Sequence, residues 1–338
     1  MSVLLEHGQS ATSSLFFRRL FLGFCAATVA VLCSVSFSVA RSDDAGVQVV
    51  VLFRTQTNHR RAALAIGSEF QSQNIRYVLL ELPERGDKAA QDDILRRLID
   101  FNPTIVATGG TKATMLVLDA LPTTPVVFFL VPNALDAPFM MEESPLSGRV
   151  AGVTTDIDPD AQLAWLARFS PRARRIGVLT SWRSQRTASA LAEAGPSHAM
   201  EVTPIEAHKD SFISAIDAIN ARRCDAVMMI PDAQVYNSAT VQRLLLWGLR
   251  QKKPVSAFSA RVTKAGALTG QYCNDEAIGR QVARLIRRVM RGADIASIGL
   301  EYPDQIDHAV NERTADLIGV PLDEELLQAC NVRFGGKE

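Results

Sequence analysis

The strongest constraint on this chain is the alternation of short apolar runs with longer amphipathic segments. The apolar runs are rich in β-branched residues and are bounded by polar residues or proline, which is typical of strands buried on both faces. A helical pattern follows each run, and that order favours a parallel sheet with helices on both faces. In the first half, strands are predicted at 47–53, 75–82, 104–108, 126–131 and 150–155, and helices at 58–73, 88–101 and 111–121.

The same order begins again after residue 156, which predicts a second lobe of the same kind. Pro125-Val126 and Pro254-Val255 enter corresponding strands, so the halves share a layout without sharing a sequence repeat. We therefore expect an α/β fold of two doubly wound parallel-sheet lobes with a hinge near 154–158. In the second half, strands are predicted at 176–180, 201–205, 226–230, 255–259 and 266–272, and helices at 158–169, 185–194, 211–222, 238–251 and 275–291.

The elements after residue 259 are too few to build a third domain. They must pack on the two lobes, so we expect the chain to cross between the lobes more than once. We assign residues 45–155 with about 275–298 to the N-terminal lobe. Residues 156–274 with about 299–338 are assigned to the C-terminal lobe.

Residues 1–40 are predicted to be a signal peptide. The segment 20–40 contains no charged residue, follows Arg18-Arg19, and ends in Ser38-Val39-Ala40, whose small side chains suit a signal peptidase. We expect cleavage after Ala40 and a periplasmic or otherwise extracytoplasmic protein. The uncharged segment is also long enough to remain as a membrane anchor, and the arginine pair also suits a twin-arginine signal.

The charge balance excludes a nucleic-acid partner held by a basic surface. The chain has 36 Lys and Arg against 36 Asp and Glu, and without residues 1–40 the net charge is about −1. Cleavage would leave Cys224, Cys273 and Cys330, an odd number that requires a free thiol or an intermolecular bond. We expect these cysteines to act as buried small hydrophobic residues rather than as functional thiols.

The sequence contains no recognisable catalytic or cofactor motif. Residues 109–112, Gly-Gly-Thr-Lys, lack the order of a phosphate-binding loop. Asp156, Asp158 and Asp160 resemble the start of a calcium loop, but Pro159 lies among them, and we favour Asp158 as the N-cap of a helix. We expect no cofactor, no metal and no enzymatic activity.

The loops that follow the strands are the remaining candidates for function. Ligands of open parallel sheets bind at the carboxyl ends of the strands, where helix N-termini point backbone N–H groups at them. Two such lobes predict a cleft that closes around a small molecule by a hinge motion. The candidate ligand-binding residues are Arg54, Thr55, Gly110, Thr111 and Asn133 in the first lobe and Ser181, Trp182, Asp232, Tyr236 and Phe258 in the second.

Three of these candidates have a structural alternative. Thr111 is expected to cap its helix, which still allows it to face a ligand. Phe258 suits a hydrophobic core better than a cleft wall. Trp182 suits surface packing as well as it suits the cleft.

Several short motifs recur in a characteristic order. The first half contains Ile105 to Ala113, Pro125 to Phe128 and Gly152-Val153-Thr154. The second half contains Pro254-Val255, Gly266-Ala267-Leu268, Gly279 to Ala283, Arg291-Gly292, Asn311 to Ala315, Gly319-Val320-Pro321 and Leu326-Leu327. In this order the motifs resemble the ABC-transporter substrate-binding proteins whose members include tryptophan- and tyrosine-type amino-acid binders, over about residues 45–330.

The resemblance implies a type I periplasmic-binding-protein fold, a cleft that closes on a solute, and an ABC permease as partner. Two loops depart from the family pattern. Residues 131–138 replace an Asp-Pro-Val and a Gly, and Asp232-Ala233 replaces Asp-Asn. We expect the ligand to be a small molecule, with an amino acid or an aromatic compound as candidates.

We therefore expect the exported solute-binding component of an ABC importer. The alternative is a periplasmic ligand-sensing module that works with a membrane sensor kinase or cyclase, and the altered loops favour that alternative.

Overall fold

The computed structural model describes residues 48–83, 87–141 and 143–336. Residues 46–338 form one compact unit. The predicted signal peptide and its cleavage site lie outside the described residues. No helix within the described ranges combines the length and the apolar character needed to cross a membrane.

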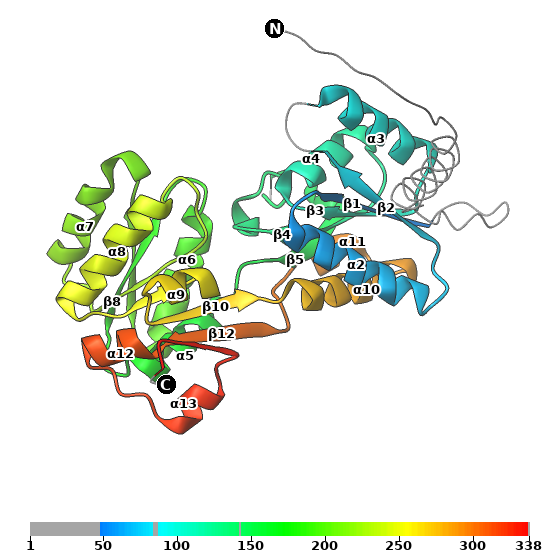
Figure 1. Cartoon of the computed structure of the whole chain (residues 1–338). Helices are drawn as coiled ribbons and strands as arrows, with labels where there is room; N and C mark the ends of the chain where they lie inside the picture. The colour runs from blue at the N-terminus through cyan, green and yellow to red at the C-terminus, as the bar shows by residue number, and fades with distance from the viewer. Residues whose placement is uncertain (1–47, 84–86, 142, 337–338) are drawn as a thin grey trace, which may run out of the picture. The chain divides into compact units, whose positions relative to one another are not determined.

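Two β-sheets organise the described chain (Figure 1). The strands of the first sheet are β1 (Val49–Arg54), β2 (Tyr77–Leu82), β3 (Ile105–Gly109), β4 (Val126–Val131), β5 (Val150–Thr154) and β11 (Leu300–Glu301). Those of the second are β6 (Arg175–Thr180), β7 (Glu201–Glu206), β8 (Ala226–Met228), β9 (Val255–Ala257), β10 (Thr269–Cys273), β12 (Ile306–Asn311) and β13 (Val332–Phe334).

The strand orders are those of doubly wound sheets. The first sheet runs β11-β5-β4-β3-β1-β2, and every pairing in it is parallel. The second runs β13-β12-β10-β9-β8-β6-β7, and β12 lies antiparallel to β10. The predicted α/β architecture of two sheets is confirmed, with the correction that the second sheet is mixed. A mixed edge is common in large sheets and needs no crossover helix.

Helices cover both faces of each sheet. The α-helices are α2 (Thr57–Gln71), α3 (Lys88–Asp100), α4 (Thr111–Ala120), α5 (Pro159–Phe169), α6 (Gln185–Ala194), α7 (Phe212–Ala221), α8 (Ser238–Gln251), α9 (Ala260–Ala265), α10 (Asp275–Met290), α11 (Ile295–Ile298), α12 (Glu312–Ile318) and α13 (Glu324–Gln328). The short 3-10 segments are η1 (Ala134–Asp136), η2 (Ser147–Arg149), η3 (Gly195–His198) and η4 (Lys209–Ser211).

Strand β1 shows why the apolar runs are continuous. Val49 and Val51 face a core that includes α2 and α10, whereas Val50 and Leu52 face a core that includes α3 and α4. Alternate side chains of a strand point to opposite faces, so a strand covered on both faces must be apolar at every position. The same division holds for β6, where Leu179 faces the α7 and α8 side and Val178 faces the α5 and α6 side.

Helix α10 packs in the core of the first sheet although β10, directly before it, belongs to the second. Ile278, Val282 and Ile286 lie in the same core cluster as residues of α2, and Figure 1 shows the blue α2 beside the orange α10. The chain then enters β11 of the first sheet and β12 of the second. The chain therefore crosses between the two sheets more than once, as predicted. The lobe boundaries remain a proposal, and β11 places Leu300 and Glu301 in the first sheet.

Several predicted element ends differ from the structure. The strands predicted to reach Ile230 and Ser259 end at Met228 and Ala257, because the chain turns away from the sheet at each point. Ser259 instead caps α9, accepting a hydrogen bond from the N–H of Val262. The strand predicted from residue 266 begins at Thr269, because Gly266 adopts φ +130° at the end of α9. Asp158 caps α5 as predicted, accepting from Asp160 N and Ala161 N.

The three cysteines of the described residues are free thiols. Cys224 is buried, as predicted, whereas Cys273 and Cys330 are half-buried, which corrects the expectation for these two. Burial raises the thiol pKa of Cys273 to about 12 and that of Cys330 to about 11. All three thiols are therefore protonated at neutral pH, because burial disfavours the thiolate.

The contact between α2 and α10 generates a stability prediction. A Cβ atom at Gly279 would lie 2.3 Å from the carbonyl oxygen of Ala62, whereas a Cβ atom at Gly148 would meet nothing within 4 Å. Gly279→Ala should lower the free energy of unfolding by about 2 kcal/mol, because the helices must separate. Gly148→Ala is the matched control and should change it little. Denaturant unfolding measures both, and equal stability of the two variants would contradict the close approach.

Candidate functional site

The first-lobe candidates lie at the carboxyl ends of neighbouring strands. Arg54 ends β1, and the hydroxyl of Thr55 donates to the carbonyl oxygen of Leu82 at 3.3 Å. Gly110 follows β3 with φ +83°, and a Cβ atom there would lie 3.1 Å from Nε2 of His59. The position therefore requires glycine, both for its backbone conformation and for its close approach to a buried histidine.

Thr111 does not cap α4, which corrects the prediction. The N-cap position is Gly110, and no side chain caps this helix. Because Gly110 completes the turn, Thr111 already has a helical backbone and comes one residue too late to act as the cap. A different threonine of α4 contacts Gly110: the Thr114 hydroxyl donates a hydrogen bond to the carbonyl oxygen of Gly110 at 3.0 Å.

His59 is a buried residue of this region to which the sequence assigned no role. It lies in α2, beside the turn at Gly110. Burial lowers its pKa, and the neighbouring charge of Arg54 lowers it further. The imidazole is therefore neutral at neutral pH. No sequence signal marks this residue, because its burial depends on the distant turn at Gly110.

The second-lobe candidates Ser181 and Asp232 form one hydrogen-bonded cluster with Ser184. Oδ2 of Asp232 accepts from the Ser181 hydroxyl at 2.7 Å, the Ser184 hydroxyl at 2.6 Å and the Ser181 backbone N–H at 3.1 Å. Its Oδ1 accepts from the backbone N–H of Gln234 at 2.8 Å. The carboxylate therefore joins the loop after β6 to the loop after β8.

The pKa of Asp232 reflects two opposing effects. Burial is the largest single influence and favours the protonated form, but the hydrogen bonds from Ser184, Ser181 and Gln234 together outweigh it. The pKa of Asp232 is consequently below its ordinary value. At neutral pH the carboxylate is ionised and its acceptor capacity is used within the protein.

Tyr236 and Phe258 pack against each other, with ring centroids 5.8 Å apart. Tyr236 is 8% exposed, and its hydroxyl oxygen has no hydrogen-bond partner among the described residues. Burial and the charge of Asp232 raise the pKa of Tyr236, so the phenol stays protonated. Phe258 is half-buried against the same core. Its core alternative is consistent with this packing, which does not test a role in ligand binding.

Trp182 is 68% exposed. The guanidinium carbon of Arg183 lies 4.5 Å from the centre of its ring. Such a cation–π contact at an exposed position stabilises the fold only slightly. Trp182 thus lies beside the Ser181 cluster in sequence, with its ring in contact with its neighbour and with solvent.

Asn133 links the loop after β4 to the loop after β8. Its backbone has φ +50°, and its side-chain Nδ2 donates to the carbonyl oxygen of Pro231 at 2.6 Å. Because Nδ2 must face this acceptor, the orientation of the amide is fixed. Asn133 is 8% exposed, and its Oδ1 has no hydrogen-bond partner among the described residues.

The buried carboxyl group of Asp156 holds the backbone at Asn133 in place. Oδ1 accepts from the backbone N–H of Asn133 at 2.8 Å, and Oδ2 accepts from Ala134 N at 2.9 Å and from the Thr154 hydroxyl at 2.8 Å. Burial raises the pKa of Asp156, and these hydrogen bonds oppose that effect. From the sequence, this aspartate was considered only as part of a calcium loop and its role was missed, since its backbone partners Asn133 and Ala134 lie more than twenty residues away.

The structure thus brings some predicted residues together and leaves others apart. Asn133 reaches the loop of Asp232, Ser181 binds Asp232, and Tyr236 packs on Phe258. Within the described ranges, no hydrogen bond joins Arg54, Thr55, Thr111 or Trp182 to another candidate. The candidate site therefore centres on the loops after β4, β6 and β8.

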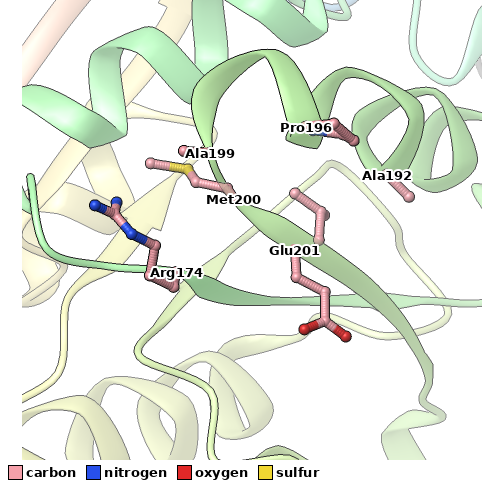
Figure 2. Close-up of a pocket in the computed structure, with 7 residues that line it drawn as sticks. Arg174, Ala192, Pro196, Ala199, Met200 and Glu201 are labelled. Atoms are coloured by element: carbon pink, nitrogen blue, oxygen red, sulfur yellow. The ribbon is translucent and has the colours of Figure 1, made fainter.

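A separate hollow of about 410 Å³ lies at the other end of the second sheet (Figure 2). Arg174 directly precedes β6 and Glu201 begins β7, so this hollow is at the amino ends of parallel strands. None of the predicted site residues lines it. The residues that line it are Arg174, Ala192, Pro196, Ala199, Met200, Glu201 and Val202.

The Asp232 cluster generates a pH prediction. Asp232→Asn should lower the free energy of unfolding by about 1–3 kcal/mol at pH 7, because the buried hydroxyls lose a charged acceptor. The folded pKa of Asp232 is lowered, so this stabilisation is present above the unfolded pKa of about 4 and is lost as the pH falls through the folded value.

Denaturant unfolding between pH 2.5 and 8 measures the difference between wild type and variant. The difference should be constant above about pH 5 and should shrink below about pH 4. Asp217→Asn, on the exposed side of α7, is the matched control and should cost little at any pH. A difference that stays the same at pH 2.5 and pH 7 would exclude this role of the charge.

Comparison with known proteins confirms the resemblance seen in the sequence. The family model described as ABC transporter substrate binding protein matches residues 74–332. A tyrosine-binding protein of Clostridioides difficile strain R20291 is 18% identical over 253 residues, which cover 74% of this chain and 72% of that protein.

Solved structures share the two-sheet fold. The ligand-free, open structure of a substrate binding protein with adhesive properties from Clostridium difficile has a TM-score of 0.67 at 16% identity and covers 86% of this chain and 100% of its own. An ABC domain in complex with L-Trp from Streptococcus pneumonia has a TM-score of 0.58 at 16% identity, with 85% and 99% covered. A periplasmic ribose ABC transporter from Conexibacter woesei has a TM-score of 0.52 at 11% identity, with 85% and 98% covered.

These structures identify the fold as that of the two-lobed periplasmic binding proteins. The family match covers most of the sequence and includes the strands and loops of the candidate site. The chain therefore belongs to the ABC transporter substrate binding proteins, an extracytoplasmic family that binds solutes.

Proposed function

We propose that this protein is exported, binds one small molecule between the loops after β4, β6 and β8, and delivers it to an ABC permease. The observation that carries the proposal is the hydrogen bond from Nδ2 of Asn133 to the carbonyl oxygen of Pro231. It joins the carboxyl-end loop of a first-sheet strand to that of a second-sheet strand. Ligands of this class of fold bind where such loops meet.

Two buried polar groups in the loops after β4 and β8 support a ligand that forms hydrogen bonds. Oδ1 of Asn133 is an acceptor, and the Tyr236 hydroxyl can donate or accept. Leaving such groups buried and unpaired costs about 1–3 kcal/mol each, so a ligand that pairs with them recovers that free energy. The aromatic faces of Tyr236 and Phe258 favour a ligand with an apolar or aromatic part.

Two of the relatives also support a ligand with an aromatic part. One is a tyrosine-binding protein, and another was solved with L-Trp. We therefore propose an amino acid or an aromatic compound as the ligand. The altered loops at Asn133 and Asp232 are the positions at which this protein would differ from those relatives.

The proposed role is binding without catalysis. Asp232 is the carboxylate at the centre of the site, and it accepts hydrogen bonds from two serines and from the backbone. A carboxylate used in this way positions loops rather than reacting with a ligand. The family match supports transport and gives no support to the alternative of a sensing module. A hinge motion that closes the lobes on the ligand is part of the proposal.

A ligand screen tests the proposal directly. At a concentration a hundredfold above its Kd, a ligand adds about 2.7 kcal/mol to the stability of the folded state. One compound from a library of amino acids, aromatic acids and nucleosides should therefore raise the melting temperature of the purified protein by roughly 5–10 °C. Small-angle scattering should then report compaction. A library without any effect on melting or scattering would contradict the transport role.

Trp182 provides a second test, because its exposure separates ligand contact from folding. Trp182→Ala should leave the melting temperature nearly unchanged and weaken binding of the screened ligand about fivefold, the loss of about 1 kcal/mol of aromatic contact. Leu64→Ala, another large exposed side chain, is the matched control in α2. Calorimetric titration measures both affinities. An unchanged affinity would remove Trp182 from the site.

A further inference from the structure

Helix α6 is not capped by its own N-cap residue. Ser184 holds the N-cap position and is of a type that suits it, yet its side chain makes no cap hydrogen bond. Its hydroxyl is already used, because it donates to Oδ2 of Asp232 at 2.6 Å and shares a hydrogen bond with the Thr180 hydroxyl at 2.8 Å. The first N–H groups of α6 must therefore find another acceptor.

Asp136, in η1 after β4, supplies that acceptor from the other lobe. Its Oδ1 accepts from the backbone N–H of Arg186 at 3.0 Å. Its Oδ2 accepts from both the backbone N–H and the hydroxyl of Thr187 at 3.3 Å. In return, the Arg186 guanidinium donates to the carbonyl oxygen of Leu135 at 2.7 Å. A carboxylate at this end of a helix is also stabilised by the helix dipole.

Segment η1 is held firmly enough to carry such a contact. Its base is fixed by Asp156, which accepts from the N–H groups of Asn133 and Ala134. Ala134 is fully buried in the first-sheet core. Asp136 therefore extends from a segment anchored in the first lobe to the start of a helix in the second lobe.

We propose that Asp136 is a positioning residue that caps α6 across the two lobes and so favours their close arrangement before ligand binds. Its effect on affinity rests on the proposed solute-binding function, whereas its effect on the arrangement of the lobes does not. Loss of a helix N-cap shifts a folding or docking equilibrium by roughly two- to thirtyfold. If the ligand binds the closely arranged lobes, its apparent Kd rises by the factor by which their population falls.

Scattering from the ligand-free protein tests the effect on the lobes. Asp136→Ala should increase the radius of gyration relative to wild type, because the lobes lose a contact that joins them. Asp136→Asn should give an intermediate value, since its amide has a single acceptor oxygen and can pair with only one of the two backbone N–H groups that Asp136 holds. Asp87→Ala is the matched control, because Asp87 caps α3 within the first lobe by accepting from the N–H of Ala90. It should lower the melting temperature without changing the radius.

Titration with L-tyrosine and L-tryptophan tests the effect on affinity. Asp136→Ala should bind about fivefold more weakly than wild type, Asp136→Asn should lie between the two, and Asp87→Ala should bind like wild type. A ligand-free Asp136→Ala protein as compact as wild type would overturn the proposal. Tighter binding by Asp136→Ala would also overturn it, because Asp136 would then compete with the ligand. If wild type binds neither amino acid, the scattering result alone decides the proposal.

Discussion

The hydrogen bonds of the buried Asp156 carboxyl group are the interactions on which the arrangement of the candidate site depends. Asp156 lies two residues after the end of β5, where the chain leaves the first sheet for the second. It accepts hydrogen bonds from the backbone N–H groups of Asn133 and Ala134 and from the Thr154 hydroxyl. Without this carboxyl group, two buried N–H groups would lack partners, at a cost of about 1–3 kcal/mol each. The left-handed backbone of Asn133 is sustained by these contacts. Asn133 and Asp136, which both contact the second lobe, lie in the segment that Asp156 holds in place.

Much of the fold could be predicted because its strands are buried on both faces. The strand Val126–Val131 and the helices Gln185–Ala194 and Ser238–Gln251 have the predicted bounds. Their hydrophobic patterns are set by local periodicity, which one sequence displays. Elements as short as β11 and β13 show no such periodicity, because their pairing depends on distant strands. The N-cap of α4 was predicted at Thr111 and lies at Gly110 for a related reason. The backbone conformation of Gly110 depends in part on its close contact with His59, which the neighbouring sequence does not show.

The position of the candidate site at the strand ends could be predicted, but the hydrogen-bond partners of its residues could not. Parallel topology places the residues after each strand at one edge, which located Asn133, Ser181 and Asp232. The partner of Asp232 in α6, Ser184, was missed because its side chain does not take the cap role that its position suggests. Asp136 was missed because it acts on a helix 50 residues away in sequence. A hydrogen bond between residues so far apart in the sequence does not change the local hydrophobic pattern from which the elements were predicted.

The place of α10 has a consequence for the order in which the protein is made. Ile278 and Val282, with other residues of α10 and Ile295 of α11, complete a core whose remaining members come from β1, α2, β3, β4 and β5. A ribosome that has finished β5 has therefore produced a first lobe with an unfilled apolar face, and it must synthesise the strands from β6 to β10 before α10 can cover that face. Exposed apolar surface of this kind makes partly synthesised chains prone to aggregation. The first half of this protein therefore keeps this apolar face uncovered by α10 until α10 has been synthesised.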